Sequence, residues 1–121
     1  MNSIFRTPEQ QESYEAYKAA GNLDRDCVLC ARESLRTFEH WRIIKNMFPY
    51  DKIAKVHHMI LPKRHVTEPE LSEEEVRELR KIKEEYFHKD YDFMIEAMGN
   101  MKSIPAHFHN HLIVVKDQGG I

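Results

Sequence analysis

Residues 107–115 read HFHNHLIVV, and this stretch decides how the rest of the chain is interpreted. The branched residues at its end favour a β-strand. His107, His109 and His111 occupy every second position, and a strand places such residues on one face, about 7 Å apart. The spacing therefore predicts three imidazoles on one surface. Asn110 should point to the opposite face, where a buried amide needs a hydrogen-bond partner.

One interpretation of these histidines involves no chemistry, namely that they form the polar outer face of an edge strand. Three chemical interpretations stay open beside it. Two or three of them could bind a metal ion, as in other H-x-H sites. One could be a nucleophile that its neighbours orient. The third interpretation divides them, with one histidine for a metal and one for chemistry.

The chain has two cysteines, Cys27 and Cys30, at the spacing C-x-x-C. In a cytosolic chain this spacing is more typical of a metal half-site or a redox pair than of a structural disulfide. The redox interpretation expects a βαβ context, which the pattern does not predict. A tetrahedral zinc site would need two histidines as its remaining ligands. The candidates are His40, His57, His58, His65 and His107.

The remaining pattern predicts an α+β domain on an antiparallel sheet of about five strands. A capping box at Ser72–Glu75 and an apolar stripe predict a long helix over Ser72–His88. Thr7 as N-cap, Pro8 at the first turn and Gly21 as a stop predict a shorter N-terminal helix. The predicted strands cover residues 40–45, 56–61, 91–98 and 107–115. We expect one domain over 1–121, with a helical extension over 1–22 and a core over 23–115.

Composition excludes several classes of function. The 121 residues carry 18 Lys and Arg against 20 Asp and Glu, a net charge of −2. This balance gives no electrostatic reason to expect nucleic acid or an anionic membrane as a partner. No apolar run approaches the roughly 20 residues that span a bilayer, and the N-terminus does not look like a secretory signal. We therefore expect a cytoplasmic protein.

Taken together, the motifs resemble those of the histidine triad (HIT) superfamily, in its zinc-containing C-x-x-C branch. Residues 107–113 resemble the triad signature H-φ-H-φ-H-φ-φ, and HHMILPKRH at 57–65 resembles the strand and Pro-Lys-x-His before the family's long helix. Asn46 to Pro49 is similar to an N-x-x-P segment of its nucleotide pocket. The resemblance runs from residue 27 to 115 and implies a HIT-like fold.

The resemblance also implies an activity. Family members hydrolyse or transfer the nucleotidyl group at the α-phosphate of nucleoside phosphoramidates, dinucleoside polyphosphates or nucleotide sugars. His109 would be the nucleophile and would form a covalent nucleotidyl-His intermediate, while His111 would contact the phosphate. One structural zinc per chain would be held by the ligand set of the family, here Cys27, Cys30, His65 and His107.

Further implied contacts concern the nucleotide and a second subunit. Asn46 would bind the ribose, and His57, Asn100 and Ser103 would lie near the phosphate. The expected partners are a small nucleotide and a second copy in a homodimer, for which the aromatic residues Trp41, Phe48 and Tyr50 are candidate contacts. The alternative is a non-catalytic nucleotide-binding or zinc-stapled interaction module. A metalloenzyme with its metal on the three triad histidines is a third possibility.

Overall fold

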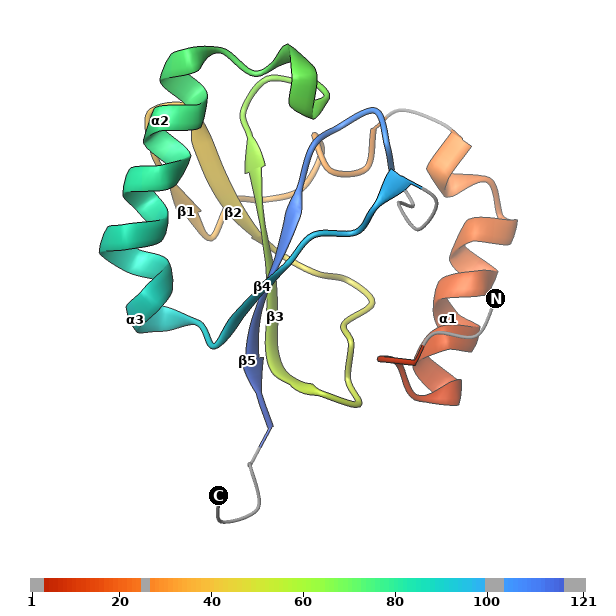
Figure 1. Cartoon of the computed structure of the whole chain (residues 1–121). Coiled ribbons are helices and arrows are strands. Elements are labelled where there is room, and N and C mark those ends of the chain that lie inside the picture. The colour runs from red at the N-terminus through yellow and green to blue at the C-terminus, as the bar shows by residue number, and fades with distance from the viewer. Residues whose placement is uncertain (1–3, 25–26, 100–103, 117–121) are drawn as a thin grey trace.

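Five strands form one antiparallel sheet in the computed structural model, which describes residues 4–24, 27–99 and 104–116 (Figure 1). The order across the sheet is β1-β2-β3-β5-β4. The bounds are β1 (Arg36–Thr37), β2 (Trp41–Lys45), β3 (Ala54–Pro62), β4 (Phe93–Ile95) and β5 (Asn110–Val115). The predicted antiparallel α+β architecture is confirmed, and β1 is the strand that the pattern did not locate.

β5 starts later than predicted, so His107 and His109 precede the strand that carries His111. The β3–β5 ladder ends at the pair Ile60 and Asn110. Before Asn110, the side chain of His107 bonds to β3, since its Nε2 lies 3.0 Å from the Pro62 carbonyl oxygen. This bond from a histidine ring stands where a backbone N–H would otherwise extend the β3–β5 ladder. β4 is also shorter than the predicted strand over 91–98.

The predicted long helix is confirmed with one irregularity. α2 (Glu73–Ile82) continues through a π-helical turn at Lys83–Phe87 into α3 (His88–Asp90). The capping box at its start is formed, since the Ser72 hydroxyl accepts a bond from the Glu75 N–H and the Glu75 carboxylate accepts one from the Ser72 N–H.

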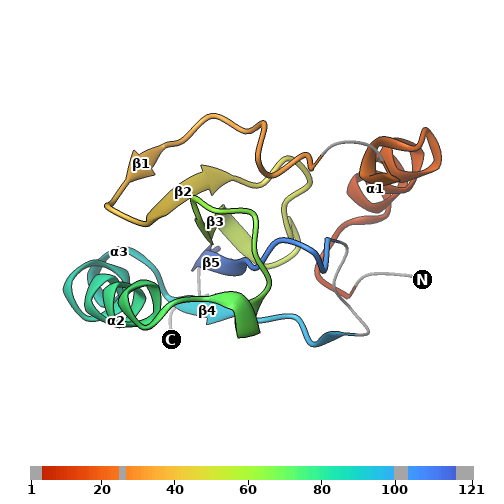
Figure 2. The same cartoon turned by 90° about the horizontal axis from the view of Figure 1, so that it is seen from above.

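α1 (Pro8–Ala19) begins and ends where the sequence predicts. The Thr7 hydroxyl caps it, and Gly21 follows it with a φ of 82°, in the left-handed region that glycine adopts without steric cost. None of its residues is fully buried. α1 and the α2–α3 helix lie on opposite sides of the sheet (Figure 2).

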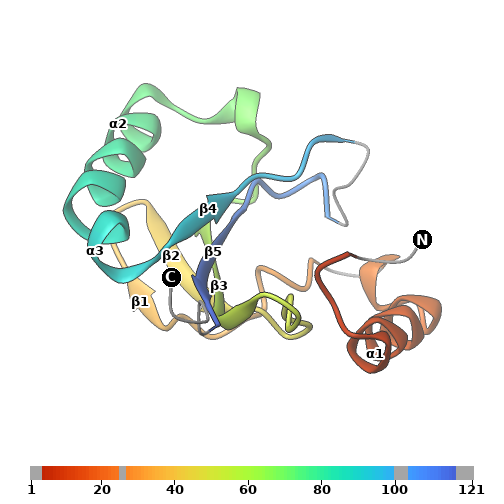
Figure 3. The same ribbon diagram turned by 60° about the horizontal axis from the view of Figure 1, so that its bottom comes forward.

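The two faces of the sheet have different neighbours, as Figure 3 shows from below. One face meets the α2–α3 helix in an apolar cluster that includes Trp41, Ile60, Ile82 and Leu112. Trp41 is fully buried there and donates from Nε1 to the Glu75 carbonyl, 2.8 Å away, so the idea that it contributes to a subunit interface is wrong.

The second face, toward α1, buries a smaller apolar cluster and carries the chemistry-bearing side chains. Ile44, Met59 and Leu61 form the centre of that cluster with Leu29. His57 on β3 points to this face, and the ring of the adjacent His58 lies instead against Tyr91, with 2.7 Å between Nδ1 and the hydroxyl oxygen.

Among the described residues, no helix is long and apolar enough to cross a membrane.

Candidate functional site

Two cysteines and two histidines from distant parts of the chain converge beside the second face. Cys27 and Cys30 lie in a turn after α1, His65 follows β3, and His107 precedes β5. Their ligand atoms all lie within 4.8 Å of one another. Sγ of Cys30 is 3.3 Å from Nδ1 of His65 and 3.4 Å from Nδ1 of His107, and Sγ of Cys27 is 3.5 Å from the latter.

These distances fit a tetrahedral metal centre. Sulfur and nitrogen ligands of one tetrahedral zinc ion are separated by about 3.5 Å, given the usual bond lengths. The His107 ring is also oriented for coordination, because its Nε2–H donates to the Pro62 carbonyl and leaves the Nδ1 lone pair facing the two sulfurs. Burial lowers the pKa of His107, which keeps the ring neutral. The donor set is therefore compatible with a metal site.

Arg42 of β2 braces the cysteine turn. Its guanidinium donates to the Leu29 carbonyl and, over 2.6 Å, to the Arg32 carbonyl. These bonds satisfy carbonyl groups on both sides of Cys30, in a turn with no regular backbone ladder of its own. No motif in the sequence marks Arg42 for this role.

Arg64, from the Pro-Lys-Arg-His motif, fixes the segment that carries His65. Its guanidinium makes two bonds to the buried Glu75 carboxylate, at 2.5 and 3.1 Å. The bonds from Arg64 outweigh burial and lower the pKa of Glu75 to about 2. A fork-like pair of this kind restricts orientation as well as distance, so the start of α2 and the His65 segment are tied together.

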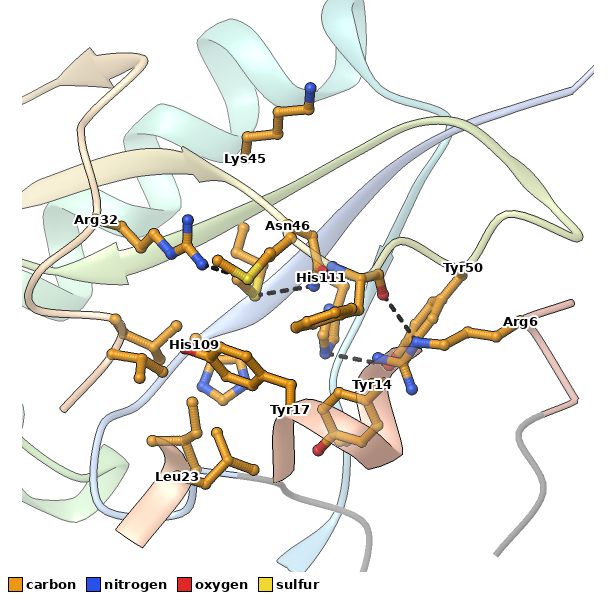
Figure 4. A pocket seen from close by; sticks show the side chains of 17 residues that line it. Arg6, Tyr14, Tyr17, Leu23, Arg32, Lys45, Asn46, Tyr50, His109 and His111 are labelled. Carbon is orange, nitrogen blue, oxygen red and sulfur yellow. Dashed lines mark hydrogen bonds between the residues drawn. The ribbon is translucent and has the colours of Figure 1, made fainter. Parts of the chain in front are cut away.

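His109 is oriented as a neutral nucleophile would be. Its Nδ1 lies 2.9 Å from the backbone carbonyl oxygen of His107. Nδ1–H is the donor in this bond, so Nε2 keeps its lone pair. The buried ring forms part of the wall of a pocket that Tyr17 of α1 also lines (Figure 4).

His57, His111 and Tyr50 form a hydrogen-bonded series next to His109. The Tyr50 backbone N–H donates to Nδ1 of His57, over 3.0 Å. In the neutral ring the hydrogen is then on Nε2, which donates to Nδ1 of His111 over 2.8 Å. Nε2 of His111 carries the remaining hydrogen and lies 3.4 Å from the Tyr50 hydroxyl oxygen.

Both rings of this series are neutral at physiological pH. Burial is the main cause that lowers the pKa of His57 to about 3 and of His111 to about 2, and the positive charge of Arg6 contributes to both shifts. The backbone bond at one end thus fixes both tautomers and places the hydrogen of His111 on Nε2, beside the Tyr50 hydroxyl at the pocket.

The pocket runs between the second face of the sheet and the N-terminal helix. Asn46 lies in its wall, where its side-chain oxygen accepts a bond from the Phe48 N–H over 2.7 Å. Asn100 and Ser103, which the sequence places near the phosphate, lie outside the described residues. The role of each predicted residue stays a prediction.

The structure adds pocket residues that motif reasoning missed. Arg6 and Tyr14 line the end that Tyr50 and His111 occupy, and Tyr17 lines the same pocket as His109 (Figure 4). Phe48 holds the helix there, with ring centroids 5.6 Å from Tyr14 and 5.0 Å from Tyr17. The spacing of the two tyrosines on one helix face was the sequence signal for this contact.

The metal cluster and the pocket divide the triad between them. Of the three histidines, His107 faces the thiols, whereas His109 and His111 line the pocket. This division favours the third of the interpretations above. Within the described part of the chain, the grouping does not support a metal shared by all three triad rings.

Comparison with known proteins shows a likeness to a solved structure. No protein-family model matches the chain, and no curated protein matches its sequence. The solved structure of a HIT family hydrolase from Clostridium thermocellum is similar, with a TM-score of 0.55 and 25% sequence identity over 80% of this chain and 96% of that one. The chain therefore has a HIT-like α+β fold, and the likeness supports a place in the histidine triad superfamily.

Proposed function

We propose that the chain is a HIT-type enzyme that hydrolyses or transfers a nucleotidyl group at the α-phosphate. Its substrate would be a nucleoside phosphoramidate, a dinucleoside polyphosphate or a nucleotide sugar. The observation that carries the proposal is the bond from Nδ1 of His109 to the His107 carbonyl, which leaves Nε2 as a nucleophile at the pocket wall. The similarity to a HIT family hydrolase supports the same class of activity.

The reaction would take place in two displacements at phosphorus. Nε2 of His109 attacks the α-phosphorus, and the bond from phosphorus to the leaving group breaks with its electron pair on that group. Water, or a second acceptor, then attacks the phosphorus of nucleotidyl-His109 and loses its proton to solvent, while the bond from phosphorus to Nε2 breaks with its electron pair on Nε2. The N–H that His111 presents would donate to a phosphate oxygen in both steps.

The Cys27, Cys30, His65 and His107 cluster would hold one structural zinc ion. Zinc bound there would cross-link the cysteine turn to the segment after β3, which carries His65, and to the segment before β5, which carries His107. It would supply no reacting group. Its effect on catalysis would be positional, because the carbonyl that orients His109 belongs to the ligand His107.

The nucleotide and subunit contacts are proposed on the same basis. Asn46 would bind the ribose and His57 would act through His111 near the phosphate, together with Asn100 and Ser103. A homodimer would use the edge strand β4, on which Phe93 is 59% exposed. Apolar side chains this exposed at a sheet edge are typical of interaction surfaces.

Trapping the covalent intermediate tests the proposal. Protein mixed with each candidate substrate, quenched in base and measured by intact mass should gain one nucleoside monophosphate. His109→Ala should show neither adduct nor turnover, and His88→Ala, at an exposed residue outside the pocket, should behave like wild type. Full turnover by His109→Ala would refute the mechanism. No adduct with any nucleotide would favour a non-catalytic binding or zinc-stapled module.

A further inference from the structure

Arg6 is fixed beside the pocket by the residues on both sides of it. The Phe5 carbonyl accepts a hydrogen bond from the Lys52 N–H, over 2.9 Å. The N–H and hydroxyl of Thr7 both donate to the Asp51 carboxylate, over 2.8 and 2.7 Å. The backbone of Arg6 is thus attached to the loop that precedes β3, and its side chain extends from a fixed position.

The guanidinium of Arg6 is oriented but not neutralised. Nε donates to the Phe48 carbonyl over 2.8 Å and Nη1 to the Gln11 side-chain oxygen over 3.3 Å. Cζ lies 4.4 Å from the ring centre of Tyr14 and 5.1 Å from that of Tyr50. Within residues 4–24, 27–99 and 104–116, no carboxylate pairs with this charge and Nη2 has no acceptor.

The described residues that line the pocket carry a net positive charge, although the chain carries a net charge of −2. Among the described lining residues, Arg6, Arg32 and Lys45 are cationic and none is acidic. Arg6 is the cation whose charge acts on both His57 and His111. It lies at the end of the pocket where the His111 N–H is presented (Figure 4).

We propose that Arg6 is a specificity-determining residue that binds a phosphate leaving group. The pocket would thereby favour one of two substrate classes. It would prefer nucleotides whose α-phosphate is joined to a further phosphate, and it would disfavour phosphoramidates, whose leaving group is an amine. This inference rests on the proposed function, because it takes His109 as the nucleophile. A guanidinium with unused N–H groups matches phosphate oxygens in charge and geometry. It has neither a negative charge nor a hydrogen-bond acceptor with which to bind an amine.

The first displacement explains the preference. When Nε2 of His109 bonds to the α-phosphorus, the bond to the bridging oxygen breaks and its electron pair stays on that oxygen. The departing phosphate is a stable anion at neutral pH and requires no proton. Its growing charge is what the guanidinium of Arg6 would stabilise.

An amine, by contrast, has to take up a proton as its bond to phosphorus breaks. His111 is a poor source of that proton at neutral pH, because burial and then the neighbouring His57 lower its pKa to about 2. The charge of Arg6 and the neutrality of His111 therefore favour the same class of leaving group.

Matched substrate pairs test the inference. Diadenosine tetraphosphate and adenosine 5′-phosphoramidate share the attacked group and differ in what leaves, and the corresponding pairs for guanosine, uridine and cytidine cover the unknown base. Wild type should have the higher kcat/KM for the phosphoanhydride of a pair. Arg6→Gln should lower that value about 10- to 100-fold and the phosphoramidate value less than about 3-fold. Arg6→Lys should lose less than Arg6→Gln on the phosphoanhydride.

Arg36→Gln is the matched control, since Cζ of Arg36 also lies over two rings, 5.0 Å from Phe38 and 4.0 Å from Tyr86, away from the pocket. It should change neither activity. Equal losses on both substrates of a pair, or no loss, would overturn the role of Arg6 and leave the proposed function standing. No turnover and no adduct with any pair would overturn both. Arg6→Lys keeps the comparison available if Arg6→Gln does not fold, which a thermal melt will show.

Discussion

Lowering the pH from 7 to 5 should destabilise the folded chain through His57 and His111. Burial lowers the pKa of His57 to about 3 and of His111 to about 2 in the folded chain, against a usual value of 6.5. In the unfolded chain both rings take up a proton as the pH falls through 6.5, whereas in the folded chain both stay neutral. The unfolded state binds more protons, so the free energy of unfolding falls with the pH.

The magnitude follows from the two pKa values. Between pH 7 and pH 5, one histidine of this kind lowers the free energy of unfolding by about 2 kcal/mol, and two lower it by about 4 kcal/mol. Urea unfolding at both pH values, at one fixed zinc concentration, measures the total. Acidic groups and metal ligands contribute to it as well, so the decisive quantity is a difference between two proteins.

His57→Gln provides that difference. The glutamine can accept from the Tyr50 N–H and donate to His111, but it does not titrate. Wild type should lose about 2 kcal/mol more than His57→Gln between pH 7 and pH 5. If wild type and His57→Gln lose equal stability, the buried neutral state of His57 is refuted.

Three further outcomes are expected. Replacing Cys27 and Cys30 by serine should reduce bound zinc from about one equivalent to less than about 0.1, measured by elemental analysis; full occupancy would show that other residues bind it. Glu75→Gln should lower the free energy of urea unfolding by about 2 kcal/mol at pH 7, because it removes the carboxylate that Arg64 contacts; an unchanged midpoint would mean that the pair adds no net stability. Asn110→Val should raise that free energy by about 1 kcal/mol, because the buried Oδ1 of Asn110 has no hydrogen-bond partner among the described residues; a lower melting temperature would contradict this.

The elements that the sequence predicted well are those with local signals. Ser72 and Glu75 mark the start of the long helix because a capping box depends on residues three apart, and Thr7 and Pro8 mark α1 in the same way. The period of two in a strand likewise accounts for the neighbours His57 and His58, whose rings lie on opposite faces of β3 and bond to His111 and Tyr91. These patterns are complete within a few residues, so no tertiary information is needed.

The parts that were missed depend on contacts between distant segments. The start of β5 depends on which group bonds to the Pro62 carbonyl, and that group is a histidine ring rather than a backbone N–H. Arg6 carries no local signal, since its position is set by Asp51 and Lys52. The sequence predicts that a buried Asn110 needs a hydrogen-bond partner. Whether it finds one depends on distant segments, and among the described residues its Oδ1 has none.

The separation of the four metal-binding side chains along the sequence has a consequence for the order of folding. Cys27 and His107 are 80 positions apart, and Cys30 and His65 are 35 apart. Closing loops of this length is entropically costly, and here it also requires that β3 and β5 have paired. Metal capture should therefore be a late event, unlike the coupled folding and binding of short zinc fingers. In refolding experiments the sheet should form at a rate that does not depend on zinc concentration, and only a later phase should respond to it.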